Sequence, residues 1–325
     1  MKYLYVLVNS TTGFYTEQTY VSMLSLRHVT PDAFISLLVD DNTANVQNNK
    51  FLDSIRSLVN EYKIISLPSD MPAIAKSRFI KTSMREYISD DFLFVDSDTI
   101  WANPVNEDDF TFDIMGVLDG HVLFSNNLAK KKNEQYFLEM NCYPKSEYYI
   151  NSGIIFSKDS IFSRKFFENW HNKWKETSLS GIFVDQPALN YVINKMSSPD
   201  KFVLPGEYNA QISNSWNFFF QAKVIHYFTF WMNNPNFNSP YIFQSLNLWE
   251  KIRENGLSDS TIQHLKNPTK AFDQNISITY LKDESLKRSA LYGFIEDLYA
   301  RKNRGEKSNF DFLEKIIIFL SKWTH

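Results

Sequence analysis

Short apolar runs alternate with stretches of helical periodicity along roughly the first two thirds of the chain. Residues 3–8 form a continuous aliphatic and aromatic run, and residues 34–39 and 92–95 repeat this signature. Such runs are typical of strands that are covered on both faces. In the segment 15–27 the apolar residues recur at near-helical spacing. The alternation predicts an α/β fold with a mostly parallel central sheet flanked by helices.

The pattern continues to about residue 228 and then changes character. We expect further strands at 64–67, 111–118 and 149–156, and further helices at 50–62, 77–88, 161–175 and 186–193. The chain then passes through a segment rich in Asn, Pro and aromatic residues. Later helices are expected around 246–255, 285–300 and 311–322. The pattern therefore predicts an α/β domain over 1–228 and a mainly helical C-terminal region over 229–325.

Composition and charge exclude several functions. The 325 residues include 34 Lys and Arg against 37 Asp and Glu, so we expect no nucleic acid partner. The single cysteine, Cys142, excludes an intrachain disulfide and a thiolate zinc cluster. No apolar run approaches the ~18 residues of a membrane-spanning helix. The sequence begins at Met1 and runs directly into a strand pattern, so we expect no signal peptide and a cytoplasmic location.

Glycine usage limits how this chain can bind phosphates. Only nine glycines occur, and none lies in a GxG, GxxxxGK or GxSxG pattern. Dinucleotide-binding turns, Walker loops and nucleophile elbows need such glycines for a close backbone approach. Any phosphate in this protein is therefore expected to be bound by a metal ion or by side chains.

Two carboxylates one residue apart follow the apolar run 92–95. Asp96 and Asp98 point to the same side of an extended chain, because side chains alternate with period two. They can share a hard divalent cation, which takes oxygen ligands and is often completed by substrate phosphates. The alternative is a solvated acidic turn, since acidic pairs also occur at 40–41, 90–91 and 108–109.

Cationic residues lie immediately before this strand. Arg78, Lys81 and Arg85 can gather toward one side of the helix predicted over 77–88. A planar guanidinium suits bidentate recognition of phosphate oxygens. The alternative is a solvated helix face, because charged residues usually lie outside.

An ordered set of motifs resembles the GT-A glycosyltransferases, in detail the group containing glycogenin and the bacterial lipopolysaccharide galactosyltransferases. The resemblance extends from about Met1 to about Phe228. In chain order the motifs are the opening strand with Tyr15 after it, Ser77-Arg78-Phe79-Ile80-Lys81, Asp96-Ser97-Asp98-Thr99, Gly116-Val117-Leu118-Asp119, Asn151-Ser152-Gly153-Ile154, Asp185-Gln186-Pro187-Ala188-Leu189-Asn190 and Val224-Ile225-His226. The ordered set is far more specific than any single motif.

The resemblance implies a metal-dependent donor site in a GT-A fold. Asp96 and Asp98 would bind Mn²⁺, with Mg²⁺ as the alternative, and the ion would bridge the diphosphate of a UDP-sugar. His226 would be the third protein ligand, and a mixed carboxylate and imidazole set fits Mn²⁺ better than an all-oxygen cage does. The alternative for His226 is a core histidine beside the aromatic residues that follow it. Its place after Val224-Ile225 favours the metal role.

Residues for the nucleotide are implied in the same way. Tyr15 would stack on uracil and Asn9 would reach the base edge, whereas ordinary loop packing is the alternative for both. Lys81 and Ser97 would contact the donor, and Arg78 would face its sugar or diphosphate.

Four positions would contact the transferred sugar: Asp119, Asn151, Asp185 and Gln186. The catalytic candidates are Asp185, Gln186 and Arg78. Asp185 would accept hydrogen bonds from sugar hydroxyls, and it can also cap the helix 186–193. The resemblance implies retention of the anomeric configuration, either by front-face attack with Gln186 supporting the anomeric centre or with Asp185 as a covalent nucleophile.

The implied activity is transfer of a hexose from a UDP-sugar to a carbohydrate or glycolipid acceptor in lipopolysaccharide or surface glycan synthesis. A sugar nucleotidyltransferase is one alternative, but such enzymes usually carry a glycine-rich loop after the first strand, where this chain has only Gly13. A non-catalytic carbohydrate-binding relative is the other. Family members often follow the metal histidine with a Gly and then a Lys, whereas Tyr227-Phe228 follow here, so the role of that lysine is unassigned.

Peripheral membrane contact is a further expectation for the C-terminal region. Apolar and charged residues alternate over 314–323, and a basic stretch lies at 301–307. A helix docked on the core is the favoured alternative, because acidic residues between 296 and 311 dilute the positive charge.

Overall fold

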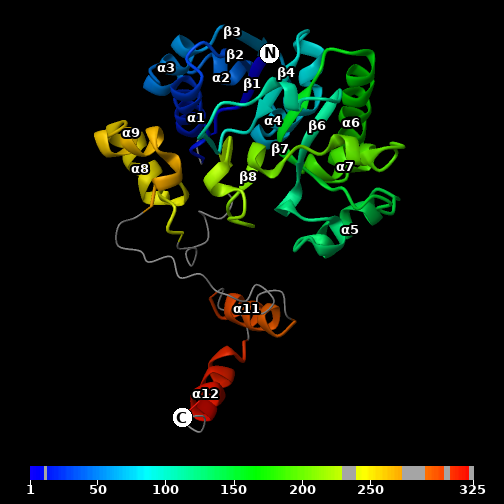
Figure 1. Cartoon of the computed structure of the whole chain (residues 1–325), viewed down its shortest axis with the longest axis vertical. Coiled ribbons are helices and arrows are strands. Elements are labelled where there is room, and N and C mark those ends of the chain that lie inside the picture. Colours follow the sequence, from blue (N-terminus) through cyan, green and yellow to red (C-terminus); the bar gives the residue numbers. More distant parts are fainter. Residues whose placement is uncertain (11–12, 229–238, 273–289, 304–307, 322–325) are drawn as a thin grey trace. The chain divides into compact units, whose positions relative to one another are not determined.

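The computed structural model describes residues 1–10, 13–228, 239–272, 290–303 and 308–321. The chain divides into two compact units, Met1–Ile276 and Ser277–His325 (Figure 1). The first unit runs past the boundary that the sequence predicts at residue 228. The reason is that α8 (Leu246–Asn255) and α9 (Asp259–Lys266) both contact α1.

A six-stranded sheet with the order β3-β2-β1-β4-β7-β6 forms the centre of the first unit. Its strands are β1 (Lys2–Leu7), β2 (Phe34–Asp40), β3 (Glu61–Ile65), β4 (Phe92–Val95), β6 (Ile114–Leu118) and β7 (Ile150–Ser157). β1 to β4 pair in parallel, and β7 runs antiparallel to both of its neighbours. The predicted mostly parallel α/β sheet is confirmed.

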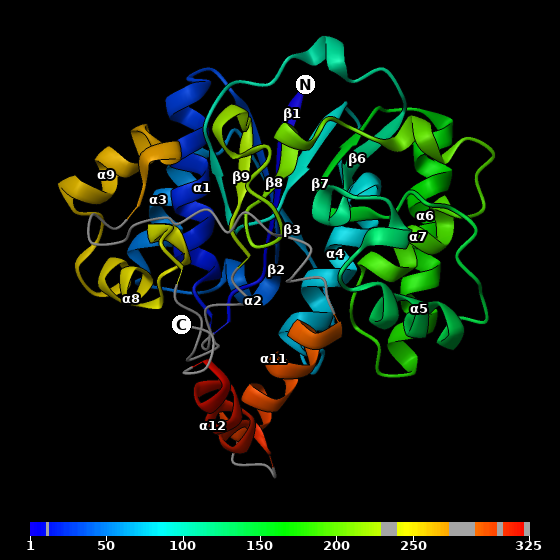
Figure 2. The same ribbon diagram turned by 60° about the horizontal axis from the view of Figure 1, so that its bottom comes forward.

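Helices cover both faces of this sheet. They are α1 (Tyr15–Val29), α2 (Asp41–Ala44), α3 (Lys50–Leu58), α4 (Ala73–Tyr87), α5 (Lys130–Glu139), α6 (Ile161–Leu179) and α7 (Gln186–Ile193). Side chains alternate along β1, so that Tyr3 and Tyr5 pack in one core with α1 and α3. Leu4 packs in a second core with α4, α6 and α7. Figure 2 shows these two groups of helices on opposite sides of the sheet.

A second, smaller sheet forms from three strands that follow β4 in the chain. β5 (Thr99–Trp101), β9 (Val224–His226) and β8 (Ala210–Gln211) pair in the order β5-β9-β8. A third core joins this sheet to α1, α3, α8 and α9. The apolar pattern predicts neither β5 nor β8, because each is only two or three residues long.

Several predicted boundaries are wrong. The helix from residue 50 ends at Leu58, four residues before the predicted end, because β3 already begins at Glu61. α4 begins at Ala73, directly after Pro72, rather than at Ser77. At the start of α1, Phe14 occupies the N-cap position, and the Thr16 hydroxyl donates to Asn9 Oδ1. The apolar pattern missed α5 and α9.

In the second unit, α11 (Ala290–Asn303) and α12 (Phe310–Ser321) contact each other through the Tyr299 and Phe310 rings. The predicted stretch 285–289 lies outside the described residues. Large apolar side chains of α12 are exposed: Phe312, Ile316, Ile317, Ile318 and Phe319. Within the described residues, none of the helices has the length and apolar character needed to cross a membrane.

Candidate metal and donor site

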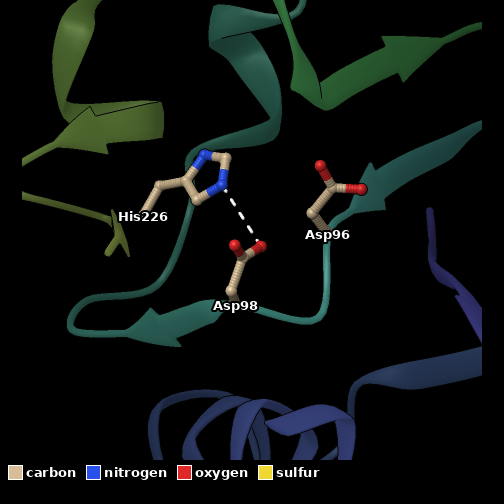
Figure 3. Close-up of side chains that lie close together, drawn as sticks. All are labelled: Asp96, Asp98 and His226. Carbon is tan, nitrogen blue, oxygen red and sulfur yellow. Dashed lines mark ion pairs between the residues drawn. The ribbon is translucent and has the colours of Figure 1, made fainter. Parts of the chain in front are cut away.

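Two carboxylates and an imidazole meet where the large sheet passes into the small one. Asp96 follows β4, Asp98 precedes β5, and His226 is the last residue of β9 (Figure 3). Each residue offers one ligand atom, and these atoms lie within 4.8 Å of one another. The structure therefore brings together the three residues that the sequence analysis assigned to a metal.

The pairing of β5 with β9 delivers the histidine. Thr99 lies opposite His226 in this antiparallel pair, and the Tyr227 N–H donates to the Asp98 carbonyl oxygen over 3.1 Å. The imidazole Nε2 then lies 3.3 Å from Asp98 Oδ1. Two carboxylates and one imidazole form a donor set that suits Mn²⁺. The residues present thus fit the ion that the resemblance implies.

Close packing holds the His226 ring. It is only 3% exposed, and the Phe228 ring stacks on it with the centroids 4.0 Å apart. Gly153 allows the close approach on β7, because a Cβ there would lie 2.4 Å from His226 Cε1. The His226 ring is therefore packed as a buried side chain, and its Nε2 faces Asp98.

Lys81 and Arg78 lie beside this cluster. The Lys81 Nζ lies 3.1 Å from Asp96 Oδ1 and 3.2 Å from Asp185 Oδ2, although the side chain is only 2% exposed. Arg78 Nε lies 3.0 Å from Asp185 Oδ1. The solvated-face alternative is wrong for Lys81. Arg85 instead donates to the carbonyl and hydroxyl oxygens of Ser157, away from the cluster.

These charges shift the pKa values of the carboxylates in opposite directions. Burial raises the pKa of Asp185, but the cations Lys81 and Arg78 outweigh this and hold it below the ordinary value. At Asp96 burial raises the pKa, the Asp98 charge adds to the rise, and Lys81 opposes it, so the pKa lies above the ordinary value. Asp185 is therefore the more firmly ionised of the two.

The residues predicted to contact the sugar lie along β6, β7 and the start of α7. Asn151 Nδ2 donates to Asp119 Oδ1 over 2.9 Å, and the Ser152 N–H donates to Gln186 Oε1 over 3.0 Å. Asp185 occupies the N-cap position of α7, but its side chain makes no capping hydrogen bond. Its carboxylate faces Lys81 and Arg78 instead, so the capping alternative is wrong.

Of the side chains predicted to contact the donor nucleotide, Lys81 contacts Asp96, and the others lie near α1. Tyr15 is half-exposed at the start of α1. Ser97 is turned toward α1, where its Oγ accepts from the Thr19 hydroxyl over 2.9 Å. Asn9 accepts from Thr16 and borders a cavity of about 410 Å³.

Arg253, from α8, borders the same cavity. Its Nε donates to Glu17 Oε1 over 2.6 Å, its Nη2 donates to the Gly13 carbonyl oxygen, and the guanidinium lies 4.1 Å from the centre of the Phe14 ring. The late helical part of the chain is thereby joined to the loop that follows β1.

Sequence reasoning missed four residues of this region. Ser152 and Gly153 stand inside a quoted motif, and the scarcity of glycine was a usable signal for Gly153. Asn209, which accepts from the His226 ring, and Arg253 carry no local signal, because an isolated Asn or Arg is common on any surface loop or helix.

The sequence of the chain matches no protein-family model and no curated protein. In structure the chain is similar to a galactosyltransferase, LgtC, solved in complex with donor and acceptor sugar analogs. The two are 14% identical, with a TM-score of 0.45, over 81% of this chain and 99% of that one. An active-site mutant of LgtC is 15% identical with a TM-score of 0.42, over 70% of this chain and 87% of the other.

The chain is also similar to the bifunctional glycosyltransferase WbbM in its apo form. The two are 17% identical, with a TM-score of 0.48, over 82% of this chain, which spans about half (51%) of that protein. The fold and the site described above rest on the chain's own topology and contacts.

Proposed function

We propose that this protein is a metal-dependent glycosyltransferase that moves a hexose from a UDP-sugar to a saccharide or lipid-linked glycan acceptor with retention. The observation that carries the proposal is the convergence of Asp96, Asp98 and His226 within 4.8 Å of one another, beside the buried cation of Lys81. Mn²⁺ is the proposed ion, with Mg²⁺ as the alternative.

Glycosyl transfer requires that negative charge be stabilised on the departing diphosphate. A divalent ion held by the three ligands would supply Lewis-acid stabilisation, worth several kcal/mol by the usual order of magnitude. Lys81 and Arg78 add positive charges that the fold fixes in advance, through ion pairs of 3.0–3.2 Å with Asp96 and Asp185. Little reorganisation is then needed when the diphosphate binds.

The surroundings of Asp185 favour one of the two retaining mechanisms. Two cations lie within 3.2 Å of its oxygens and lower the basicity of the carboxylate. A less basic carboxylate is a weaker nucleophile, so we favour front-face attack, in which the leaving phosphate takes the acceptor's proton. Gln186, held by the Ser152 N–H, would then support the anomeric centre.

A donor screen tests the proposal. The protein is incubated with a panel of UDP-hexoses and Mn²⁺, and UDP release is measured with and without EDTA. Metal-dependent UDP release, even as slow hydrolysis, is the expected result. Formation of UTP and hexose 1-phosphate when pyrophosphate is added to the UDP-hexose would indicate a nucleotidyltransferase instead, and binding without turnover would indicate a non-catalytic relative.

We also propose a cytoplasmic location with peripheral contact at the inner face of the membrane. The exposed apolar side chains of α12 and the ion pair between Lys302 and Asp311 support an amphipathic C-terminal unit.

A further inference from the structure

A chain of buried amides connects the predicted sugar residues to the predicted metal ligand. Asn209 is fully buried at the end of the 3-10 turn Gly206–Asn209. Its Nδ2 donates to Asn151 Oδ1 over 3.0 Å, and its Oδ1 lies 3.0 Å from Nδ1 of His226. Asn151 in turn donates to Asp119. The four side chains form one continuous hydrogen-bonded path.

Groups with a single hydrogen-bonding role fix the direction of this path. The Gly153 N–H can only donate, and it lies 2.9 Å from one end of the Asn151 amide, which must therefore be the oxygen. The other end faces the Asp119 carboxylate, which also accepts from Asn127, so it must be the nitrogen. The orientation of the Asn151 amide is thus determined at both ends.

The same logic extends to the histidine. Asn151 Oδ1 can only accept, so the Asn209 atom that faces it is the amide nitrogen, and the Asn209 oxygen faces the His226 ring. An amide oxygen can only accept, so Nδ1 of His226 carries the proton. In the neutral ring Nε2 then keeps its lone pair, on the side that faces Asp98 Oδ1 at 3.3 Å.

We propose that Asn209 is the positioning residue that sets the tautomer and orientation of His226 and so prepares Nε2 as a metal ligand. The inference rests on the metal site of the proposed function. Partners that hold a ligating imidazole in this way typically account for about 10–100-fold in metal affinity. Because the path begins at Asp119 and Asn151, it also links the sugar-binding side of the site to the metal.

The first test measures the tautomer directly, without metal. Nitrogen NMR of the ¹⁵N-histidine-labelled full chain near pH ~8, above the ordinary His pKa, reports which ring nitrogen is protonated, and a His226→Gln spectrum assigns the signal. We expect His226 to be protonated at Nδ1 in the native chain. A ring protonated only at Nε2 overturns the inference, whatever the Asn209 variants show.

Two variants and a control complete the experiment. Asn209→Leu removes the acceptor, and we expect a shift toward the Nε2–H form and an affinity for Mn²⁺ alone, measured by calorimetry, that is about 10–100-fold lower. Asn209→Asp keeps an acceptor and should retain the Nδ1–H form. Asn190→Leu removes comparable buried hydrogen bonds to Ile150 and should lower stability while leaving the His226 tautomer and Mn²⁺ affinity unchanged.

The outcomes separate this inference from the proposed function. If the native chain does not bind Mn²⁺, the proposed metal site fails, and the tautomer measurement still decides the role of Asn209. If the native chain binds Mn²⁺ and Asn209→Leu binds it equally well, the inference fails while the proposed function stands. An equal loss of affinity in Asn209→Leu and Asn190→Leu would show a merely structural role and would also overturn the inference.

Discussion

At the scale of single residues, the candidate metal site depends on side chains that each have one geometric task. Asp98 Oδ1 lies 3.3 Å from His226 Nε2, and Asp98 directly precedes β5 of the small sheet. Gly153 contributes no side chain, and its small size leaves room for the imidazole. Substitutions at these two positions therefore test the metal ligand and the space around it separately.

Asp98→Asn should abolish metal-dependent donor binding while leaving the fold intact, because the amide keeps the shape of the side chain and loses its charge. Partners that only orient a ligand account for about 10–100-fold in affinity, so loss of a ligand should cost at least ~100-fold in Mn²⁺ affinity by calorimetry. Asp108→Asn is the control, because Asp108 is an exposed member of the acidic pair 108–109 and does not belong to the metal cluster. Near-normal Mn²⁺-stimulated activity in Asp98→Asn would refute the assigned role.

Gly153→Ala should displace the His226 ring, because the new Cβ would lie 2.4 Å from Cε1 and 2.9 Å from Asn151 Oδ1. We expect a loss of about 1–3 kcal/mol in the free energy of unfolding from overpacking, with weaker Mn²⁺ binding. Gly293→Ala is the control, since it adds a methyl group to open space on α11. Unchanged Mn²⁺ affinity in Gly153→Ala would contradict the assigned contact.

At the scale of elements, the pairing of β5 with β9 and the packing of α4 on α6 decide where the charged groups lie. β5 and β9 place His226 opposite Thr99. α4 carries Arg78 and Lys81 to the site, and its Thr82 hydroxyl contacts Nδ1 of His171 on α6 over 2.8 Å. The α4–α6 contact therefore holds the helix that carries Arg78 and Lys81 in place. It also contains a buried titratable side chain, that of His171.

This contact predicts a dependence of stability on pH. Burial lowers the pKa of His171 to about 4, against an ordinary value of about 6.5, so between these values the unfolded chain binds more protons than the folded chain. Stability should therefore fall as the pH falls below about 6.5, by about 2 kcal/mol at pH ~5. Denaturant unfolding at pH ~7.5 and ~5 measures this loss.

The matched variant His171→Gln keeps a polar partner for Thr82 and does not titrate. Its free energy of unfolding should change less than that of the native chain over the same pH interval. If the native chain and His171→Gln lose equal stability between the two pH values, His171 is not the titrating group.

At the scale of the whole molecule, the candidate site and the exposed apolar helix belong to different compact units. All residues assigned to the site lie in the first unit, whereas Ile317 and its neighbours on α12 lie in the second. A chain of residues 1–276 should therefore unfold cooperatively and bind Mn²⁺ by itself. The second unit is expected to contribute membrane affinity instead.

Co-sedimentation with vesicles that contain anionic lipid tests this division. The full chain should bind, residues 1–276 should not, and Ile317→Glu should weaken binding by about tenfold or more, because burial of one Ile side chain contributes about 1.5–3 kcal/mol. Ile161→Glu, at an isoleucine of α6 that is 89% exposed against 50% for Ile317, is the control. Equal binding by the full chain and residues 1–276 would exclude the C-terminal unit as the contact.

Much of the fold could be read from the sequence, because strand and helix periods are local. The run 92–95 and the helices 186–193 and 246–255 appear in the structure with the predicted bounds. Boundaries were less predictable where a helix began directly after a proline or a strand began early, as at Pro72 and Glu61. Short elements such as β5 and β8 leave no period to detect.

The sequence by itself determined the alternation of strands and helices, the pair Asp96 and Asp98 after β4, and the absence of the usual glycine-rich phosphate loops, since these are properties of adjacent residues. Only the tertiary structure decided that Nε2 of His226 faces Asp98 and that Lys81 lies between Asp96 and Asp185. It likewise decided that Asn209 holds the imidazole. Contacts of this kind join residues far apart in the chain, and they depend on how sheets and helices pack rather than on any local pattern.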